Sequence, residues 1–186
     1  MSEYHPHRMK PLPSVEYLKE RLVYRDGMLF WQKRPRGDFR TQRACSVWNA
    51  RYGGKRAGCP MTNGYRLICL NEAKFLEHRV IFHMVKEPLT QFDYVDHRDT
   101  DHTNNHDDNL RKCTHAQNLK NQPARQNALP KHVCWSKRER KYKVGIRSDG
   151  VHHFIGTFAD LGDAARAAEE ASKRLHGEFR NTVVPV

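Results

Sequence analysis

A run of eleven polar residues, 98–108, separates two short apolar segments and constrains this part of the chain most strongly. The segment before it, Tyr94-Val95-Asp96-His97, is predicted to be a short strand, and Asn109 to Thr114 a second one. A helix is predicted from about His115 to Ala124. The predicted order is therefore strand, polar loop, strand, helix.

Asp96 and His97 are neighbours on the first of these strands, so their side chains point to opposite faces unless the strand ends there. Hydrolysis of a phosphodiester needs a base for water, which a neutral His97 can supply, and a divalent cation to offset charge. Asp96 and Asn118 offer oxygen ligands for a hard cation such as Mg²⁺, and Mn²⁺ is an open alternative. Asn109 can offer its carbonyl oxygen to orient His97.

The remaining polar residues around this motif have simpler explanations. Asn104 and Asn105 are expected to be turn residues. His102 and His106 are expected to be solvated, and Asp99 with Asp101 to be a solvated acidic pair rather than a second cation site. On the preceding helix, packing or hydrogen bonding is expected for His78 and His83.

The net charge of +12 creates a positive field, whose commonest soluble partner is nucleic acid; a basic ribosomal or solubility-driven surface is the alternative. Hydrophobic residues make up 38% and lie in short segments, which predicts several small units. No segment approaches the ~18 apolar residues of a membrane span, and no signal peptide is recognised. Five unpaired-looking cysteines fit a reducing cytosol, so a cytoplasmic protein is expected, in the bacterial host if phage-encoded.

Zinc is a minor alternative at Cys45, Cys59 and Cys69, whose spacings match no standard zinc knuckle. Buried apolar cysteines are the default expectation. Whether these three cysteines bind anything is left open.

The segment VDHRDTDHTNNHDDNLRKCTHAQNLKN resembles the HNH motif of phage and intron homing endonucleases, which have the ββα-metal fold. WNARYGGKRAG, the Asn63-Gly64-Tyr65 strand and the Glu77-His78-Arg79 helix start resemble the leading segment of the same family. The resemblance implies metal ligation by Asp96 and by the helical Asn118. It also implies that His97 is the base and that Asn109 orients it.

The C-terminal part, 132–181, is predicted to be a three-stranded sheet with one helix packed on it. The predicted strands are Val133 to Ser136, Tyr142 to Arg147 and His152 to Phe158, followed by a helix between Asp160 and Gly177. Basic residues interleaved with aromatic ones on strands are typical of a nucleic-acid surface. The candidate DNA-binding residues are Arg111, Lys120, Trp135, Lys137, Arg138, Arg140, Tyr142, Lys143 and Arg147.

This part also resembles the AP2 DNA-binding domain in its I-G-T-F strand, its Asp163-Ala164-Ala165 helix and its closing His176-Gly177. The resemblance implies a sheet that contacts the major groove. The predicted fold class is α+β: a ββα-metal nuclease core followed by a small AP2-like domain of three strands and a helix. The predicted domains are an N-terminal helix and hairpin extension (1–53), an HNH nuclease domain (54–122), a linker (123–131) and the AP2-like domain (132–186). Residues 1–13 are predicted to be a loose tail, Ser14 to cap a helix, Asp26-Gly27 to form a hairpin turn, 32–57 to be mostly loop, and Glu77 to Lys86 to be a helix.

The predicted function is metal-dependent, sequence-directed hydrolysis of double-stranded DNA by a monomer that has no membrane contact. With one active site per chain, a nick is favoured unless two chains assemble. Two alternatives stay open: a DNA-binding regulator with a vestigial nuclease unit, and an RNA-binding structural protein. The residues do not identify the target sequence.

Overall fold

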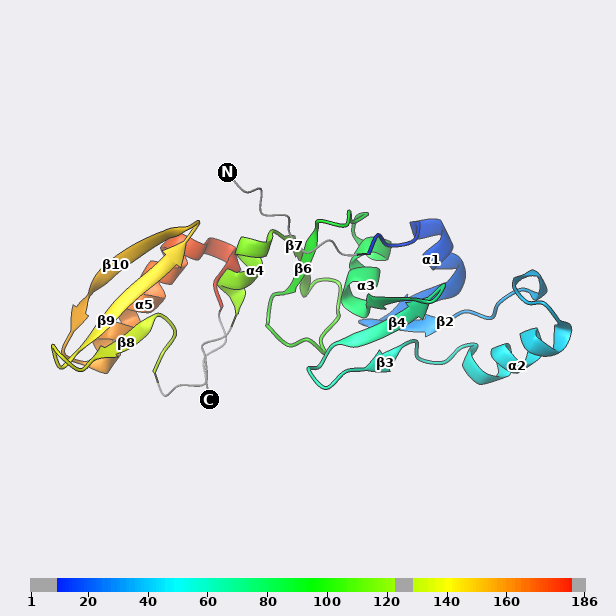
Figure 1. Ribbon diagram of the computed structural model, residues 1–186, viewed down its shortest axis with the longest axis horizontal. Helices are drawn as coiled ribbons and strands as arrows, with labels where there is room; N and C mark the ends of the chain where they lie inside the picture. The colour runs from blue at the N-terminus through cyan, green and yellow to red at the C-terminus, as the bar shows by residue number, and fades with distance from the viewer. Residues whose placement is uncertain (1–9, 123–128, 182–186) are drawn as a thin grey trace. The chain divides into compact units, whose positions relative to one another are not determined.

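The computed structural model describes residues 10–122 and 129–181, and the chain divides into two compact units (Figure 1). The first unit contains the described residues up to His97 together with Asp101–Lys112. The second contains Arg98–Thr100 and the described residues from Cys113 onward. Most of the predicted linker, and most of the N-terminal tail, lie outside the described residues. Each unit mixes helices with small sheets, so the α+β class is confirmed.

The first unit begins with a helix and a hairpin that the local sequence specifies. The Ser14 hydroxyl accepts a hydrogen bond from the Tyr17 N–H and caps the first helix. Asp26 and Gly27 both have positive φ, as a two-residue hairpin turn requires. The elements are α1 (Val15–Arg21), β1 (Leu22–Arg25), β2 (Met28–Trp31), η1 (Arg36–Asp38) and α2 (Gln42–Tyr52).

Helix α2 corrects the prediction that residues 32–57 are mostly loop. The Thr41 hydroxyl caps it by accepting from the Ala44 N–H, and Gly53 ends it. Its one buried residue is Cys45, so the helix has no apolar stripe by which its sequence could be recognised. Trp48 instead packs against Trp31, with ring centroids 5.8 Å apart and nearly perpendicular planes.

The rest of the first unit is a three-stranded sheet, a buried helix and a two-stranded sheet. Strand β4 lies between β3 and β5, and β6 pairs with β7. Confirmed predictions include β6 over its full length and α3 to within one residue. The elements are β3 (Cys59–Pro60), β4 (Arg66–Leu70), β5 (Ala73–Leu76), α3 (Glu77–Val85), β6 (Tyr94–His97) and β7 (Leu110–Cys113).

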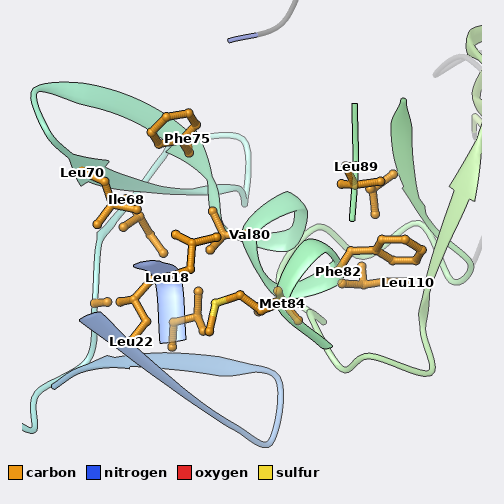
Figure 2. Packing of buried hydrophobic residues seen from close by; sticks show 14 residues of the cluster. Leu18, Leu22, Ile68, Leu70, Phe75, Val80, Phe82, Met84, Leu89 and Leu110 are labelled. Carbon is orange, nitrogen blue, oxygen red and sulfur yellow. The ribbon is translucent and has the colours of Figure 1, made fainter. Parts of the chain in front are cut away.

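Helix α3 is the centre of the first unit's core (Figure 2). Val80 and Met84 face side chains from α1, β1 and β4, while Phe82 lies beside Leu110 of β7. Every residue from Glu77 to Met84 is buried. Because buried polar groups need hydrogen-bond partners, the polar residues of α3 must find them inside the unit.

The second unit has helix α4, a three-stranded antiparallel sheet and a long helix. Thr114 and Gln117 form a capping box at α4, which ends at Asn121, earlier than the predicted Ala124. In the long helix, Asp160 accepts from the Asp163 N–H at the start and Gly177 ends it, as predicted. The elements are α4 (His115–Asn121), β8 (Val133–Ser136), β9 (Lys141–Ser148), β10 (Val151–Phe158), α5 (Leu161–His176) and η2 (Gly177–Phe179).

Strand β9 is central in this sheet, with β8 and β10 on its two sides. Val144 and Ile146 are fully buried, and α5 packs against this side of the sheet through Ala164 and Ala168. Within residues 10–122 and 129–181, no helix is both long enough and apolar enough to cross a bilayer.

Candidate active site and nucleic-acid interface

Asp96 and His97 are the last two residues of β6, and both are buried. They have different partners, as expected for neighbours on a strand. Asp96 Oδ2 accepts from Arg111 Nε at 2.9 Å and from Arg111 Nη2 at 2.7 Å. His97 Nε2 lies 2.8 Å from the Asn105 Oδ1 atom in the polar loop. The motif is thus built into the interior of the first unit.

A buried network of Arg56, Glu77, Asn105 and His97, called here the Glu77 network, orients the imidazole. Asn105 Nδ2 donates to Glu77 Oε2 at 3.2 Å, which turns Asn105 Oδ1 toward the ring. His97 Nε2 is therefore the donor in that contact, and the lone pair of the neutral ring is on Nδ1.

Glu77 is fully buried and is held by donors from two other segments. Arg56 donates to both carboxylate oxygens, with Nη2 at 2.8 Å from Oε2, and the Leu29 N–H donates to Oε1 at 3.2 Å. Such a charge-assisted, two-pronged contact fixes the carboxylate in one orientation. The orientation of His97 is thereby anchored on Arg56.

Aromatic rings surround the other side of His97. The ring centroid of His78 lies 4.9 Å away, and that of Tyr65 lies 6.0 Å away. His102 stacks on Tyr65 at 4.0 Å, and its Nδ1 lies 3.1 Å from the Asn63 carbonyl oxygen. Three imidazoles and a phenol therefore meet at the end of β6.

Burial, and then the neighbouring His97, holds the pKa of His78 well below its ordinary value, so His78 is neutral near pH 7. Burial, and then the charge of Asp96, raises the pKa of Tyr65, so the phenol keeps its proton. Neutral His78 and Tyr65 can therefore pack against His97 without adding a competing charge.

The polar loop is fixed to the rest of the first unit rather than solvated throughout. The Tyr24 hydroxyl contacts Asp107 Oδ1 at 3.0 Å, and Asn109 Nδ2 donates to the Asn104 carbonyl at 2.8 Å. Gly27 lies against it so closely that a Cβ there would be 2.9 Å from the His106 nitrogen. The role of Asn109 in orienting His97 stays a prediction.

Asn105, Glu77 and Arg56 are site residues that the sequence patterns did not identify. Asn105 was expected to be a turn residue, but it is 4% exposed and both ends of its carboxamide are bonded. The one available signal was an acidic residue, Glu77, at the start of a helix whose later positions are mostly apolar. A buried charge of that kind needs a partner, but its identity comes only from the fold.

The predicted metal ligands lie in different units. Asp96 belongs to the first unit, while Asn118 lies on α4 in the second, so the ligation by Asn118 stays a prediction. The described residues contain no group of three or more His, Cys, Asp or Glu side chains placed to hold a metal ion. A single carboxylate with water ligands suits Mg²⁺, which keeps several waters in proteins.

The cysteines are free thiols, and their default expectation of burial is wrong for three of the five. Cys45 is buried, but Cys59 and Cys69 are exposed, as is Cys134. Cys69 lies on β4 opposite Lys74.

A second candidate site is the sheet face of the second unit that points away from α5. The buried Val144, Ile146 and Ser148 define the α5 side of β9, so the alternate residues Lys141, Lys143 and Arg147 lie on the open side. The pairing of Arg147 with His152, and of Gly145 with Phe154, extends this face onto β10.

The open face, meaning these residues of β9 and β10, combines cations with an exposed aromatic ring. Phe154 is 63% exposed, and the His152 ring lies over Gly145, where a Cβ would be 2.6 Å from Nε2. Neither Phe154 nor His152 was among the predicted contacts. Period-two alternation along 151–158 is the signal that could have identified them.

The predicted DNA-binding residues fall into four groups, of which Lys143 and Arg147 on the open face are the first. Lys137, Arg138 and Arg140 are exposed in the turn between β8 and β9, next to the open face. Trp135 and Tyr142 pair across β8 and β9 with ring centroids 4.7 Å apart, on the α5 side of the sheet. Their contact with DNA stays a prediction.

The other two predicted contacts, Lys120 and Arg111, have protein partners, as does Lys143, whose Nζ donates to Glu139 Oε1 at 2.6 Å. Lys120 donates to Asp149 at 3.0 and 3.1 Å. The Arg111 side chain is 6% exposed and pairs with Asp96, so it lies in the interior and not on the surface where a phosphate would bind. Arg111 is therefore not part of the candidate interface.

Comparison with models of protein families, with curated proteins and with solved structures finds no match for this chain.

Proposed function

We propose that the chain is a metal-dependent endonuclease that hydrolyses double-stranded DNA at an HNH-type site, with His97 as the general base. The observation that carries the proposal is the Glu77 network. A buried histidine is held in one orientation and one tautomer by Asn105, which Glu77 holds in turn, and Glu77 is itself held by Arg56. General base catalysis needs this positioning before it needs any particular pKa.

Each residue has a defined task in the proposed reaction. His97 accepts a proton from the attacking water at Nδ1, the nitrogen that carries the lone pair. Asn105 stabilises the ring by accepting from Nε2, and the carboxylate of Glu77 holds Asn105 in place. A divalent cation held by Asp96, with Asn118 as the second predicted ligand, would offset the charge on the phosphate and the leaving oxygen.

The second unit supplies affinity for DNA in this proposal. Lys141, Lys143 and Arg147 on the open face, with Lys137, Arg138 and Arg140 in the adjoining turn, form a basic surface on a rigid sheet. A sheet face of this kind can enter the major groove. Phosphate contacts set the register of the protein, while arginine can read guanine.

The test is cleavage of DNA fragments with and without Mg²⁺, with the ends mapped on each strand. His97→Ala should abolish cleavage and leave DNA binding nearly unchanged. The matched control is His106→Ala, which removes an exposed histidine of the same loop and should cut like the parent protein. Equal cutting by the His97 variant would refute the assignment. With one site per chain, we expect a nick from a monomer.

A DNA-binding regulator with a vestigial nuclease unit is the second candidate, favoured by one observation. The carboxylate of Asp96 is already paired with Arg111 in the interior, and a cation next to that guanidinium would be repelled. This candidate predicts the same DNA binding with no Mg²⁺-dependent cutting. The assay above distinguishes the two.

A further inference from the structure

The first unit contains a cavity of about 620 Å³ between α2, β2 and the β4–β5 strands. This volume lies within the range of pockets that hold small molecules, roughly 300–1,000 Å³. The residues of the candidate active site other than Arg56 do not line it. The cavity is therefore a second concave site on this unit, which we call the tryptophan pocket.

Aromatic rings form one wall of the tryptophan pocket. Trp31 and Trp48 meet edge to face, and Trp48 lies 5.3 Å from Tyr52. All three side chains are half-buried, so parts of their rings are exposed in the cavity. Partly exposed rings of this kind are the surfaces on which nucleobases stack, and stacking tolerates any base.

Four cations also line the pocket, and one of them, Arg34, lies over the Trp48 ring at 5.2 Å from its centroid. Arg21 and Arg34 both pair with Asp38, and Arg56 pairs with Glu77. Lys74 is exposed and forms no ion pair with any residue that the structure describes. Four cations against two carboxylates make the pocket net positive, which suits a ligand that is both aromatic and anionic.

We propose that the tryptophan pocket binds one unpaired nucleotide of a DNA strand, with the base against Trp48 and the phosphate near Lys74. A base in intact duplex has both faces covered by its neighbours, so only an unpaired or extruded base can use these rings. The proposal rests on DNA as the partner proposed above, but it does not require cleavage.

Arg56 connects this pocket to His97. Its guanidinium lines the pocket and donates to Glu77, whose other contact holds Asn105 against the imidazole. A nucleotide phosphate that attracted Arg56 would compete with Glu77 for the same donors. A nucleotide whose phosphate reached Arg56 as well as Lys74 would therefore also affect the orientation of His97.

The test uses the intact protein carrying Trp135→Phe, after anisotropy has compared its DNA binding with that of the parent protein, because Trp135 is itself a predicted DNA contact. The chain has three tryptophans, so this variant reports only from Trp31 and Trp48. In chelator, to prevent cleavage, three probes are added: a single-stranded 12-mer, the same sequence fully paired, and dAMP. We expect strong quenching by the single strand, weak quenching by the duplex, and weak quenching by dAMP because flanking phosphates are missing.

Binding is measured in parallel by anisotropy of a labelled 12-mer, using single substitutions. Trp48→Ala should weaken single-strand binding about 5- to 150-fold, the usual effect of removing one stacking ring. Lys74→Ala changes an exposed residue and is less of a risk to folding than Trp48→Ala. It should lower the salt slope of single-strand binding by about 0.7. Phe92→Ala and Lys19→Ala, exposed residues of the first unit outside the pocket, are the matched controls and should change neither quantity.

Four results would overturn the proposal. DNA that binds without quenching the two tryptophans would refute the pocket alone and leave the endonuclease proposal intact. Equal quenching by duplex and single strand would show that the pocket does not select an unpaired base. Quenching by dAMP alone would make the ligand a free nucleotide rather than DNA. Absence of any DNA binding would refute this proposal together with the proposed function.

Discussion

Replacing Glu77 by glutamine should invert the tautomer of His97 while keeping the shape of the site. The glutamine has one acceptor and one donor where the carboxylate has two acceptors. The Leu29 N–H is a fixed backbone donor in the core, so the glutamine oxygen stays at the Oε1 position to accept from it. The amide nitrogen then faces Asn105, whose carboxamide must rotate and present Nδ2 to the imidazole. His97 Nε2 becomes an acceptor, and its proton moves to Nδ1.

The same substitution should lower the free energy of unfolding of the first unit. Removing one partner of a buried ion pair costs about 3–5 kcal/mol. The Arg56 side chain is 26% exposed and can be solvated by water, so we expect a loss below that range, about 2–3 kcal/mol. Stability is lost because Arg56 Nη2 then faces the amide nitrogen of the glutamine, which is also a donor.

Two measurements check this prediction: urea denaturation for stability, and ¹H–¹⁵N correlation spectra of the His97 ring for the tautomer. Glu87→Gln is the matched control, because Glu87 makes an exposed pair with Lys112 at 3.6 Å. It should cost less than about 0.5 kcal/mol and leave the tautomer unchanged. If Glu77→Gln keeps the proton on Nε2, Asn105 does not transmit the orientation of Glu77, and the reasoning about the network is wrong.

Three further predictions concern other parts of the molecule. Burial lowers the pKa of His132 to about 4 in the folded protein. The unfolded chain therefore binds a proton at a higher pH than the folded protein does, and stability is lost as the pH falls from 6.5 toward 4. His132→Asn should flatten this dependence in urea denaturation at pH 7 and pH 5, and an unchanged dependence would contradict it. Gly58→Ala should lower the free energy of unfolding, measured by thermal unfolding, by about 2–4 kcal/mol. The reason is that Gly58 has a φ of +73° and that a Cβ there would lie 2.4 Å from the Leu67 carbonyl oxygen. A loss below about 1 kcal/mol would show that the turn relaxes. Removing Lys137 and Arg140 together should lower the salt slope of duplex binding by about 1.8, and an unaltered slope excludes both as phosphate contacts.

Local signals predicted the elements whose causes are local. The Ser14 cap, the Asp26-Gly27 turn and the Asp160 and Gly177 ends of α5 each depend on residues within a few positions of one another. Strand β6 was found because it ends where an eleven-residue polar run begins. Helix α2 was missed because its packing is supplied by Trp31, a residue outside the helix, rather than by an apolar stripe of its own.

The candidate site was predictable only in its central pair. Asp96 and His97 are adjacent, but Arg56, Glu77 and Asn105 come from three separate segments joined by hydrogen bonds 8 to 28 residues apart in sequence. No periodicity records such pairings. Arg111 illustrates the same limit in reverse, since its place in a basic run suggested a phosphate contact while the fold pairs it with Asp96.

The Glu77 network is better explained by positioning of His97 than by stability. Charged groups that enter a core lose their hydration, and replacing a buried ion pair by well-packed apolar residues is often neutral or stabilising. Helix α3 already has Val80, Ile81 and Phe82 to anchor it, so a fully buried glutamate at its first turn is not needed for packing. The Glu77 carboxylate accepts a hydrogen bond from Asn105 and so fixes its orientation, and Asn105 contacts the ring of His97. The cost of burying Glu77 is therefore explained if His97 must present one nitrogen in one direction, which is the requirement of a general base.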